Sequence, residues 1–93
     1  MNFDSDPQKA AANIKKHKGV TFREAETVFG DPLARMFEDD EHSYEEKRNA
    51  IFGRSDQNRL LMISYTERES DTIRIISARL ATPKEARNYA NQT

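Results

Sequence analysis

Two apolar segments joined by a short polar turn constrain the fold more than any other feature of this sequence. Residues 59–67 (RLLMISYTE) and 72–81 (TIRIISARLA) are rich in β-branched and aromatic residues, and the polar stretch RESD lies between them. A short turn joins antiparallel neighbours, so the pair predicts a β-hairpin. Residues 47–54 (KRNAIFGR) precede the pair and are separated from it by the turn-like stretch SDQN. They predict a third strand of an antiparallel meander. A weaker alternation of apolar and polar residues over 33–39 (LARMFED) predicts a fourth strand, which comes first in the meander.

Capping residues predict a first helix near the N-terminus. Asp6 is a favourable N-cap residue, and Pro7 suits the first helical position because its missing N–H needs no partner there. Gly19, after Lys18, is placed to end this helix. Three apolar residues at helical spacing form the expected inner stripe: Ala10, Ala11 and Ile14.

Two further helices begin at threonine residues that are followed three positions later by glutamate. Thr21 with Glu24, and Thr82 with Glu85, have the spacing of a capping box, in which each side chain satisfies a free backbone N–H of the helix start. The expected buried face of the helix after Thr21 consists of Phe22, Ala25, Val28 and Phe29. The whole pattern predicts an α+β fold with two N-terminal helices, a four-stranded mainly antiparallel sheet and a C-terminal helix. The length of 93 residues predicts a single domain over residues 1–93.

Composition excludes several classes of protein. The absence of cysteine excludes disulfide frameworks and thiolate metal sites. No apolar run is long enough for a membrane span, and no apolar secretory region follows the first residue, so a cytoplasmic protein is expected. His42 lies among acidic residues, but without a paired histidine motif it does not predict a metal site, and no cofactor is expected.

Charge is unevenly distributed along a chain whose net charge is only −1. Basic residues cluster near the N-terminus, acidic residues predominate within positions 38–46, and arginines recur through the second half. Such polarity can hold a polyanion on one surface, while the acidic block favours a small basic protein partner on another. The isolated glycines form no phosphate-binding loop.

Arginine, tyrosine and histidine without a metal suit RNA cleavage by the 2′-hydroxyl of the RNA itself. Arginine stabilises the extra negative charge on phosphorus, whereas histidine, glutamate, lysine or tyrosine can transfer the protons. Arg74 and Arg79 both lie on the strand expected over residues 72–81, but on a regular strand they point to opposite faces. They can serve one site only if that strand twists or bulges.

The chain resembles the BrnT family of type II toxin–antitoxin ribonucleases, which is a branch of the RelE-like toxin fold. The resemblance is carried by DPQKAAANIKKHKGVTFREAETVF, EEKRNAIFGRS, LLMISYTER and, above all, RIISARLATPKEARNY. It implies a ribonuclease toxin that stops translation and is neutralised by an antitoxin with a ribbon-helix-helix DNA-binding domain. The implied partners are therefore RNA and this antitoxin, which resembles BrnA, with DNA bound only through the antitoxin and no membrane involved.

The resemblance and the residue chemistry together suggest a set of site residues. Arg79 is the first choice for the scissile phosphate, with Arg68 facing it across the hairpin turn, and Arg74 is expected to be an RNA-binding or a structural residue and not a catalytic one. The other candidates are Tyr89 as a stacking ring or proton donor, His17 and Lys16 as base or phosphate ligand, and Glu85 as an RNA-binding residue or the salt-bridge partner of Arg79.

Two other classes of function remain open from the sequence. One is a non-catalytic interaction module of the same fold that binds a partner protein or RNA. The other is a structural protein whose exposed sheet pairs with a partner.

Overall fold

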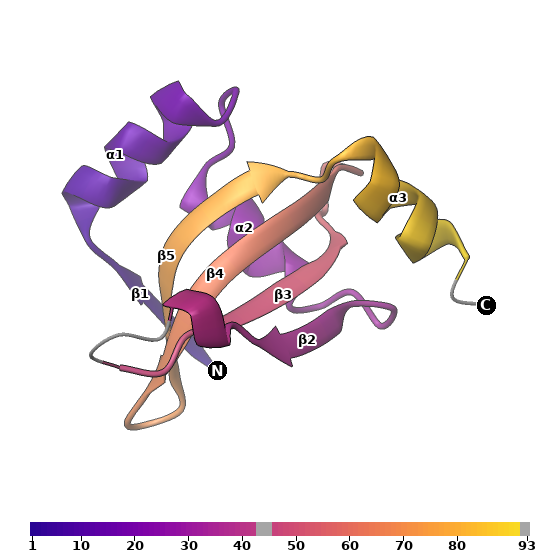
Figure 1. Ribbon diagram of the computed structural model, residues 1–93. Helices are drawn as coiled ribbons and strands as arrows, with labels where there is room; N and C mark the ends of the chain where they lie inside the picture. Colours follow the sequence, from indigo (N-terminus) through magenta and orange to yellow (C-terminus); the bar gives the residue numbers. More distant parts are fainter. Residues whose placement is uncertain (43–45, 92–93) are drawn as a thin grey trace.

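A five-stranded mixed sheet and three α-helices form the domain (Figure 1). The computed structural model describes residues 1–42 and 46–91. The strand order is β1-β5-β4-β3-β2. The elements are β1 (Asn2–Ser5), α1 (Pro7–Lys16), α2 (Phe22–Val28), β2 (Arg35–Glu38), a 3-10 turn (Asp40–His42), β3 (Asn49–Arg54), β4 (Leu60–Arg68), β5 (Thr72–Leu80) and α3 (Pro83–Ala90).

The predicted antiparallel meander is confirmed, and it contains one irregularity. β2, β3, β4 and β5 pair antiparallel in sequence order. Opposite β4, the register shifts so that Ser64 pairs with Ser77 but Tyr65 pairs with Ile75, which leaves Ile76 as an extra residue in β5. Such a bulge reverses the alternation of side chains beyond it. The shift places Arg74 on the same face of the sheet as Arg79.

The prediction of four strands was wrong because it missed β1. Residues Asn2–Ser5 pair in parallel with Thr72–Ile75 of β5, which makes the sheet mixed. This strand has only four residues, and Phe3 is its one large apolar side chain. A parallel partner about seventy residues away in sequence leaves no local turn signal, so the hydrophobic pattern did not reveal the pairing.

The core lies between α2 and one face of the sheet, and Figure 1 shows α2 behind the strands. Three of the four residues expected on the inner face of α2 are buried, and Phe29 is partly buried with its ring 5.3 Å from that of Phe3 and 5.1 Å from that of Tyr65. The sheet contributes alternate residues of β3, β4 and β5, as expected for a sheet with one covered face. The fully buried members include Val20, Val28, Ile51, Leu61 and Ile63.

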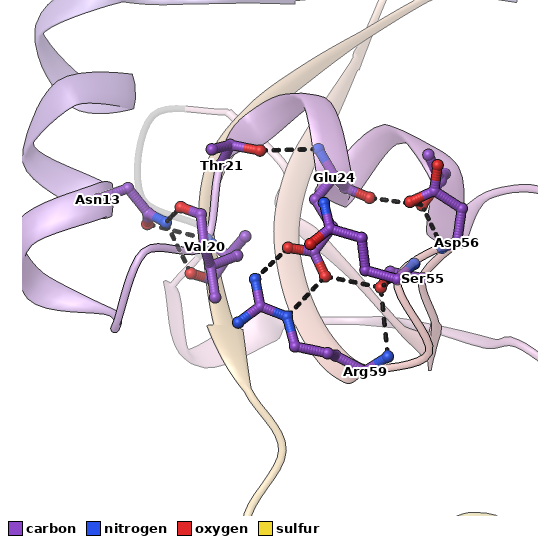
Figure 2. A network of polar contacts seen from close by, with 10 residues as sticks. Asn13, Val20, Thr21, Glu24, Ser55, Asp56 and Arg59 are labelled. Carbon is purple, nitrogen blue, oxygen red and sulfur yellow. Dashed lines mark hydrogen bonds and ion pairs between the residues drawn. The ribbon is translucent and has the colours of Figure 1, made fainter.

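The Thr21 start of α2 is capped as predicted, but the capping box is only half formed (Figure 2). The Thr21 hydroxyl accepts a hydrogen bond from the Glu24 amide at 3.0 Å. Glu24 is only 2 % exposed, and its carboxylate accepts hydrogen bonds from Arg59 on both oxygens. It also accepts one from the Ser55 hydroxyl at 2.6 Å. The hydrogen bonds from Arg59 lower the pKa of Glu24 despite its burial. This buried ion pair joins α2 to the turn between β3 and β4.

The inner face of α1 differs from the predicted apolar stripe. Asp6 caps the helix by accepting from the Gln8 amide at 2.8 Å, as predicted, but the helix ends at Lys16, short of Lys18. Ile14 is 44 % exposed, and the buried residue of this helix is Asn13. Burying a polar amide requires hydrogen-bond partners, and the partners of Asn13 are backbone groups of β5 and of the segment after the helix.

The second face of the sheet is left largely open. All four residues of β2, Arg35–Glu38, are exposed, and Arg35 and Phe37 are the two that lie on this face. α3 covers one end of this face through Tyr89, whose ring lies 5.7 Å from that of Phe52. The capping box predicted for α3 is confirmed in full, with Thr82 and Glu85 each bonding the other's backbone N–H.

Candidate functional site

A cavity of about 410 Å³ opens on the uncovered face of the sheet. Its floor follows from the register, because Phe37, Ala50, Ser64 and Ser77 lie opposite one another on four successive strands. Helix ends and a connecting segment form the walls. The wall residues are His17 just after α1, Asp39 and Arg48 between β2 and β3, Arg79 near the end of β5, and Glu85 in the first turn of α3.

Arg79 is held in the cavity by a two-pronged ion pair. Its Nη1 donates to Oε1 of Glu85 at 2.8 Å and its Nη2 donates to Oε2 at 3.0 Å, while Nη1 also donates to the Leu80 carbonyl at 3.2 Å. Within the described part of the chain, these bonds use three of the five guanidinium N–H groups and leave Nε–H and one Nη2–H. Those two donors are adjacent, as a bidentate phosphate contact requires.

Glu85 connects the guanidinium to the start of α3. Its Oε1 accepts from Arg79 and also from the Thr82 amide at 2.9 Å, so one carboxylate caps the helix and orients the arginine. The hydrogen bonds from Arg79 lower the pKa of Glu85 to about 2. The same contact raises the pKa of Arg79. Both groups are therefore charged across the physiological pH range, and Glu85 is unsuited to donate a proton.

A buried amide near the end of α1, four residues before His17, attaches this helix to β5. The side-chain nitrogen of Asn13 donates to the carbonyls of Ala78 at 2.8 Å and Val20 at 3.0 Å, and its oxygen accepts from the Ala78 amide at 3.0 Å (Figure 2). Asn13 thus satisfies both backbone groups of the residue that precedes Arg79. His17 lies one helical turn after Asn13, on the same side of α1. The bonds of Asn13 therefore link the end of α1 that precedes His17 to the residue of β5 that precedes Arg79.

Several lining residues were missed by sequence reasoning. Arg48 lines the cavity together with Asp39, whose amide donates to the Arg48 carbonyl at 2.9 Å. Ser64, Ser77 and Phe37 carry no motif. They could have been found only from the pairing register, which brings them into one row once the bulge at Ile76 is known.

Two of the predicted arginines lie away from the cavity. Arg68 does not face Arg79 across the turn, because Arg79 pairs with Met62 and Arg68 stands six residues further along β4, about 20 Å away at the strand rise. There Arg68 bonds Glu46 at 2.8 Å. Arg74 shares the face of Arg79 but pairs with both carboxylate oxygens of Asp4 in β1, at 3.0 and 2.9 Å.

Tyr89 and Lys16 also lie outside the cavity lining. Tyr89 is 8 % exposed, and its hydroxyl donates to Oδ2 of Asp31 at 2.7 Å, while the Arg54 guanidinium stands 5.4 Å from its ring centre. Burial raises the pKa of this phenol. Lys16 is an exposed residue at the end of α1. Of the seven predicted site residues, the structure brings Arg79, Glu85 and His17 together.

Within residues 1–42 and 46–91, no three histidine, cysteine or acidic side chains are placed to share a metal ion. The side chain of His42 and residues 43–45 of the acidic block lie outside what the structure describes. None of the described helices has the length and hydrophobicity needed to cross a membrane.

Comparison with known proteins defines the class of this molecule as a ribonuclease toxin of a type II toxin–antitoxin system. Residues 6–85 match the family described as "Ribonuclease toxin, BrnT, of type II toxin-antitoxin system". Because this match spans most of the chain, the protein belongs to the BrnT family, as its sequence motifs predicted.

The fold agrees with a solved member of that family. The crystal structure of the Brucella abortus ribonuclease toxin BrnT matches with a TM-score of 0.67 and 21 % sequence identity, over 88 % of this chain and 97 % of that one. At this identity the likeness concerns the fold. A search among curated proteins finds no match.

Proposed function

We propose that this protein cleaves RNA in the cavity on the open sheet face, with Arg79 and His17 as its catalytic residues. The observation that carries the proposal is the arrangement of Arg79, which Glu85 holds by one edge of its guanidinium while the Nε edge remains available. A fixed, always charged fork is suited to a phosphate that gains negative charge in the transition state. His17 lines the same cavity.

The chemistry uses the RNA's own nucleophile. The 2′-oxygen forms a bond to the adjacent phosphorus while the bond from phosphorus to the 5′-oxygen of the next nucleotide breaks, giving a 2′,3′-cyclic phosphate and a 5′-hydroxyl. One proton leaves the 2′-hydroxyl and one joins the departing oxygen. His17 performs one of these transfers, since an imidazole can accept or donate a proton. Arg79 supplies the positive charge at phosphorus, so the reaction proceeds without a metal ion.

The biological role that follows is arrest of translation, reversed by a cognate antitoxin that carries a ribbon-helix-helix DNA-binding domain. Support for the antitoxin comes from membership of a family of type II toxins. A complex with such an antitoxin would contact DNA through the antitoxin alone.

The test is RNA cleavage by purified variants, with and without EDTA. Arg79→Ala is expected to lose about 2–3 orders of magnitude in kcat, in line with the removal of one group that stabilises transition-state charge. Arg79→Lys should recover little, because an ammonium group cannot reproduce the fork. Arg74→Ala is the matched control, since it removes the same charge from the same strand face but should lower stability more than cleavage.

Full cleavage by folded Arg79→Ala would refute the site assignment. Loss of cleavage in EDTA that a divalent ion restores would refute the metal-free mechanism. If the parent protein binds RNA but never cleaves it, the protein is a binding module instead of an enzyme.

A further inference from the structure

A second arginine lies in line with Arg79 across the open face of the sheet. Register pairs Met62 with Arg79, Phe52 with Met62, and Arg35 with Phe52, so these four side chains form one row that crosses β5, β4, β3 and β2. Directly opposed residues of antiparallel strands point to the same face. Three strand spacings separate the two arginines, or about 14 Å between their backbones.

The surface between the two arginines is hollow and apolar at its base. A second cavity, of about 380 Å³, lies beside the first and shares Phe37, Met62 and Glu85 with it. Phe52 and Met62 form part of its floor, and its rim is polar. The rim residues include Arg35 on β2 and Asn88 on α3.

One side of this second cavity is an exposed aromatic ring. Phe37 is 48 % exposed, so its ring is accessible to a ligand in this cavity. Arg35 is also exposed, and it forms no ion pair within the described part of the chain. An exposed ring beside an exposed guanidinium is the combination by which proteins bind single-stranded nucleic acid, with a base on the ring and a phosphate on the cation.

We propose that the row from Arg79 to Arg35 is the track of single-stranded RNA, and that Arg35 binds a second phosphate of the strand cleaved at Arg79. The base between the two phosphates lies over Met62 against the ring of Phe37, where the Asn88 amide can bond its edge. The inference rests on the proposed function, because it takes Arg79 as the position of the scissile phosphate. The inference adds the path of the RNA, which runs from Arg79 across the β-strands toward Arg35 on β2.

Cleavage of substrates of two lengths tests the track. A dinucleotide reaches Arg79 alone, whereas an oligonucleotide that extends past the scissile phosphate also reaches Arg35. Arg35→Ala is expected to raise KM for the long substrate about tenfold, the effect of one charge-assisted contact, with kcat unchanged. KM for the dinucleotide should not change. Arg23→Ala, which removes the same charge from the exposed side of α2 behind the sheet, is the matched control and should leave both constants unchanged.

A binding measurement makes the inference independent of catalysis. The probe is a fluorescent oligoribonucleotide with 2′-O-methyl groups, which has no free nucleophile. Arg35→Ala should weaken its binding about tenfold and reduce the slope of log Kd against log salt by about one, since one phosphate contact is lost. Phe37→Ala should weaken binding with no change in that slope, because stacking releases no counterions.

The outcomes separate the two proposals. If the parent does not cleave RNA but its binding depends on Arg35 and Phe37, the catalytic proposal fails and the track stands. If the parent cleaves RNA while Arg35→Ala binds and cleaves the long substrate as the parent does, the track is refuted. Unchanged RNA binding by Arg35→Ala, together with weaker binding of the antitoxin, would assign the row to a protein interface and also overturn the inference.

Discussion

Replacement of Asn13 by alanine should both destabilise the protein and slow cleavage. Asn13 is 4 % exposed, and its side chain makes three hydrogen bonds, to the Ala78 amide, the Ala78 carbonyl and the Val20 carbonyl. At about 1 kcal/mol for each bond, their loss costs about 3 kcal/mol. For a domain of this size, that corresponds to a fall of about 12–24 °C in the melting temperature.

The effect on catalysis follows from the place of Asn13, which links the helix end before His17 to the residue before Arg79, the two proposed catalytic residues. Without its amide, the end of α1 loses its attachment to β5, so His17 is no longer held relative to Arg79. A small displacement of a proton-transfer group lowers the rate of the chemical step more than the binding of substrate. We therefore expect kcat of Asn13→Ala to fall about 100-fold, with KM changed much less.

Ser55→Ala provides the matched control for stability. The buried Ser55 hydroxyl also takes part in three hydrogen bonds, with Glu24 at 2.6 Å and with the amides of Gln57 and Arg59 at 3.2 and 3.4 Å, but it lies behind the sheet from the cavity. Thermal melts of both variants should show large losses. Cleavage, measured well below each midpoint, should fall only in Asn13→Ala.

A double-mutant cycle with His17→Ala decides whether Asn13 acts through the histidine. If it does, adding Asn13→Ala to His17→Ala should change kcat little further. Two effects that multiply in full would refute the positioning argument, as would a kcat of Asn13→Ala equal to that of Ser55→Ala.

Two further predictions concern α3. The pKa of Glu85 is lowered from 4.5 to about 2 by Arg79, so its ion pair stabilises the fold fully above about pH 4.5 and is lost as the pH falls toward 2. Glu85→Gln keeps a capping side chain and should therefore lose less stability than the parent between these pH values. Acid titrations followed by circular dichroism would show the difference. Tyr89→Phe should lower stability by about 1–2 kcal/mol, because it removes one of the hydrogen bonds to the Asp31 carboxylate, while kcat stays near the parental value. A large loss of kcat in a stable variant would instead indicate a catalytic role for Tyr89.

Local signals predicted the helices and the meander, whereas contacts between distant segments were not predictable. The caps at Asp6, Thr21 and Thr82 depend on residues within one turn, and all three helices begin where those residues indicate. β1 and the bulge at Ile76 depend on pairing partners elsewhere in the chain. From the sequence, Arg74 and Arg79 were expected on opposite faces of β5 unless the strand twisted or bulged. The bulge itself could not be predicted, because it depends on the pairing with β4.

The candidate site was predicted in part for the same reason. Arg79 and Glu85 are six residues apart, and the capping box between Thr82 and Glu85 is a local motif that fixes where Glu85 lies, so the pair could be named from the sequence. The buried Asn13 was overlooked because hydrophobic periodicity assigns inner positions to apolar residues such as Ile14. The error over Arg68 was avoidable, since a residue beside a hairpin turn cannot face one at the far end of the paired strand.

The parallel pairing of β1 with β5 has a consequence for the order in which the chain folds. Asn13 and its partner Ala78 are 65 residues apart in sequence, and β1 joins β5 over a similar separation. Contacts between such distant segments close large loops and form late and slowly. During synthesis, the N-terminal segment leaves the ribosome long before β5 exists to receive it. His17 and Arg79 therefore meet only after the meander is complete, so a nascent or partly folded chain carries both groups without an assembled cavity.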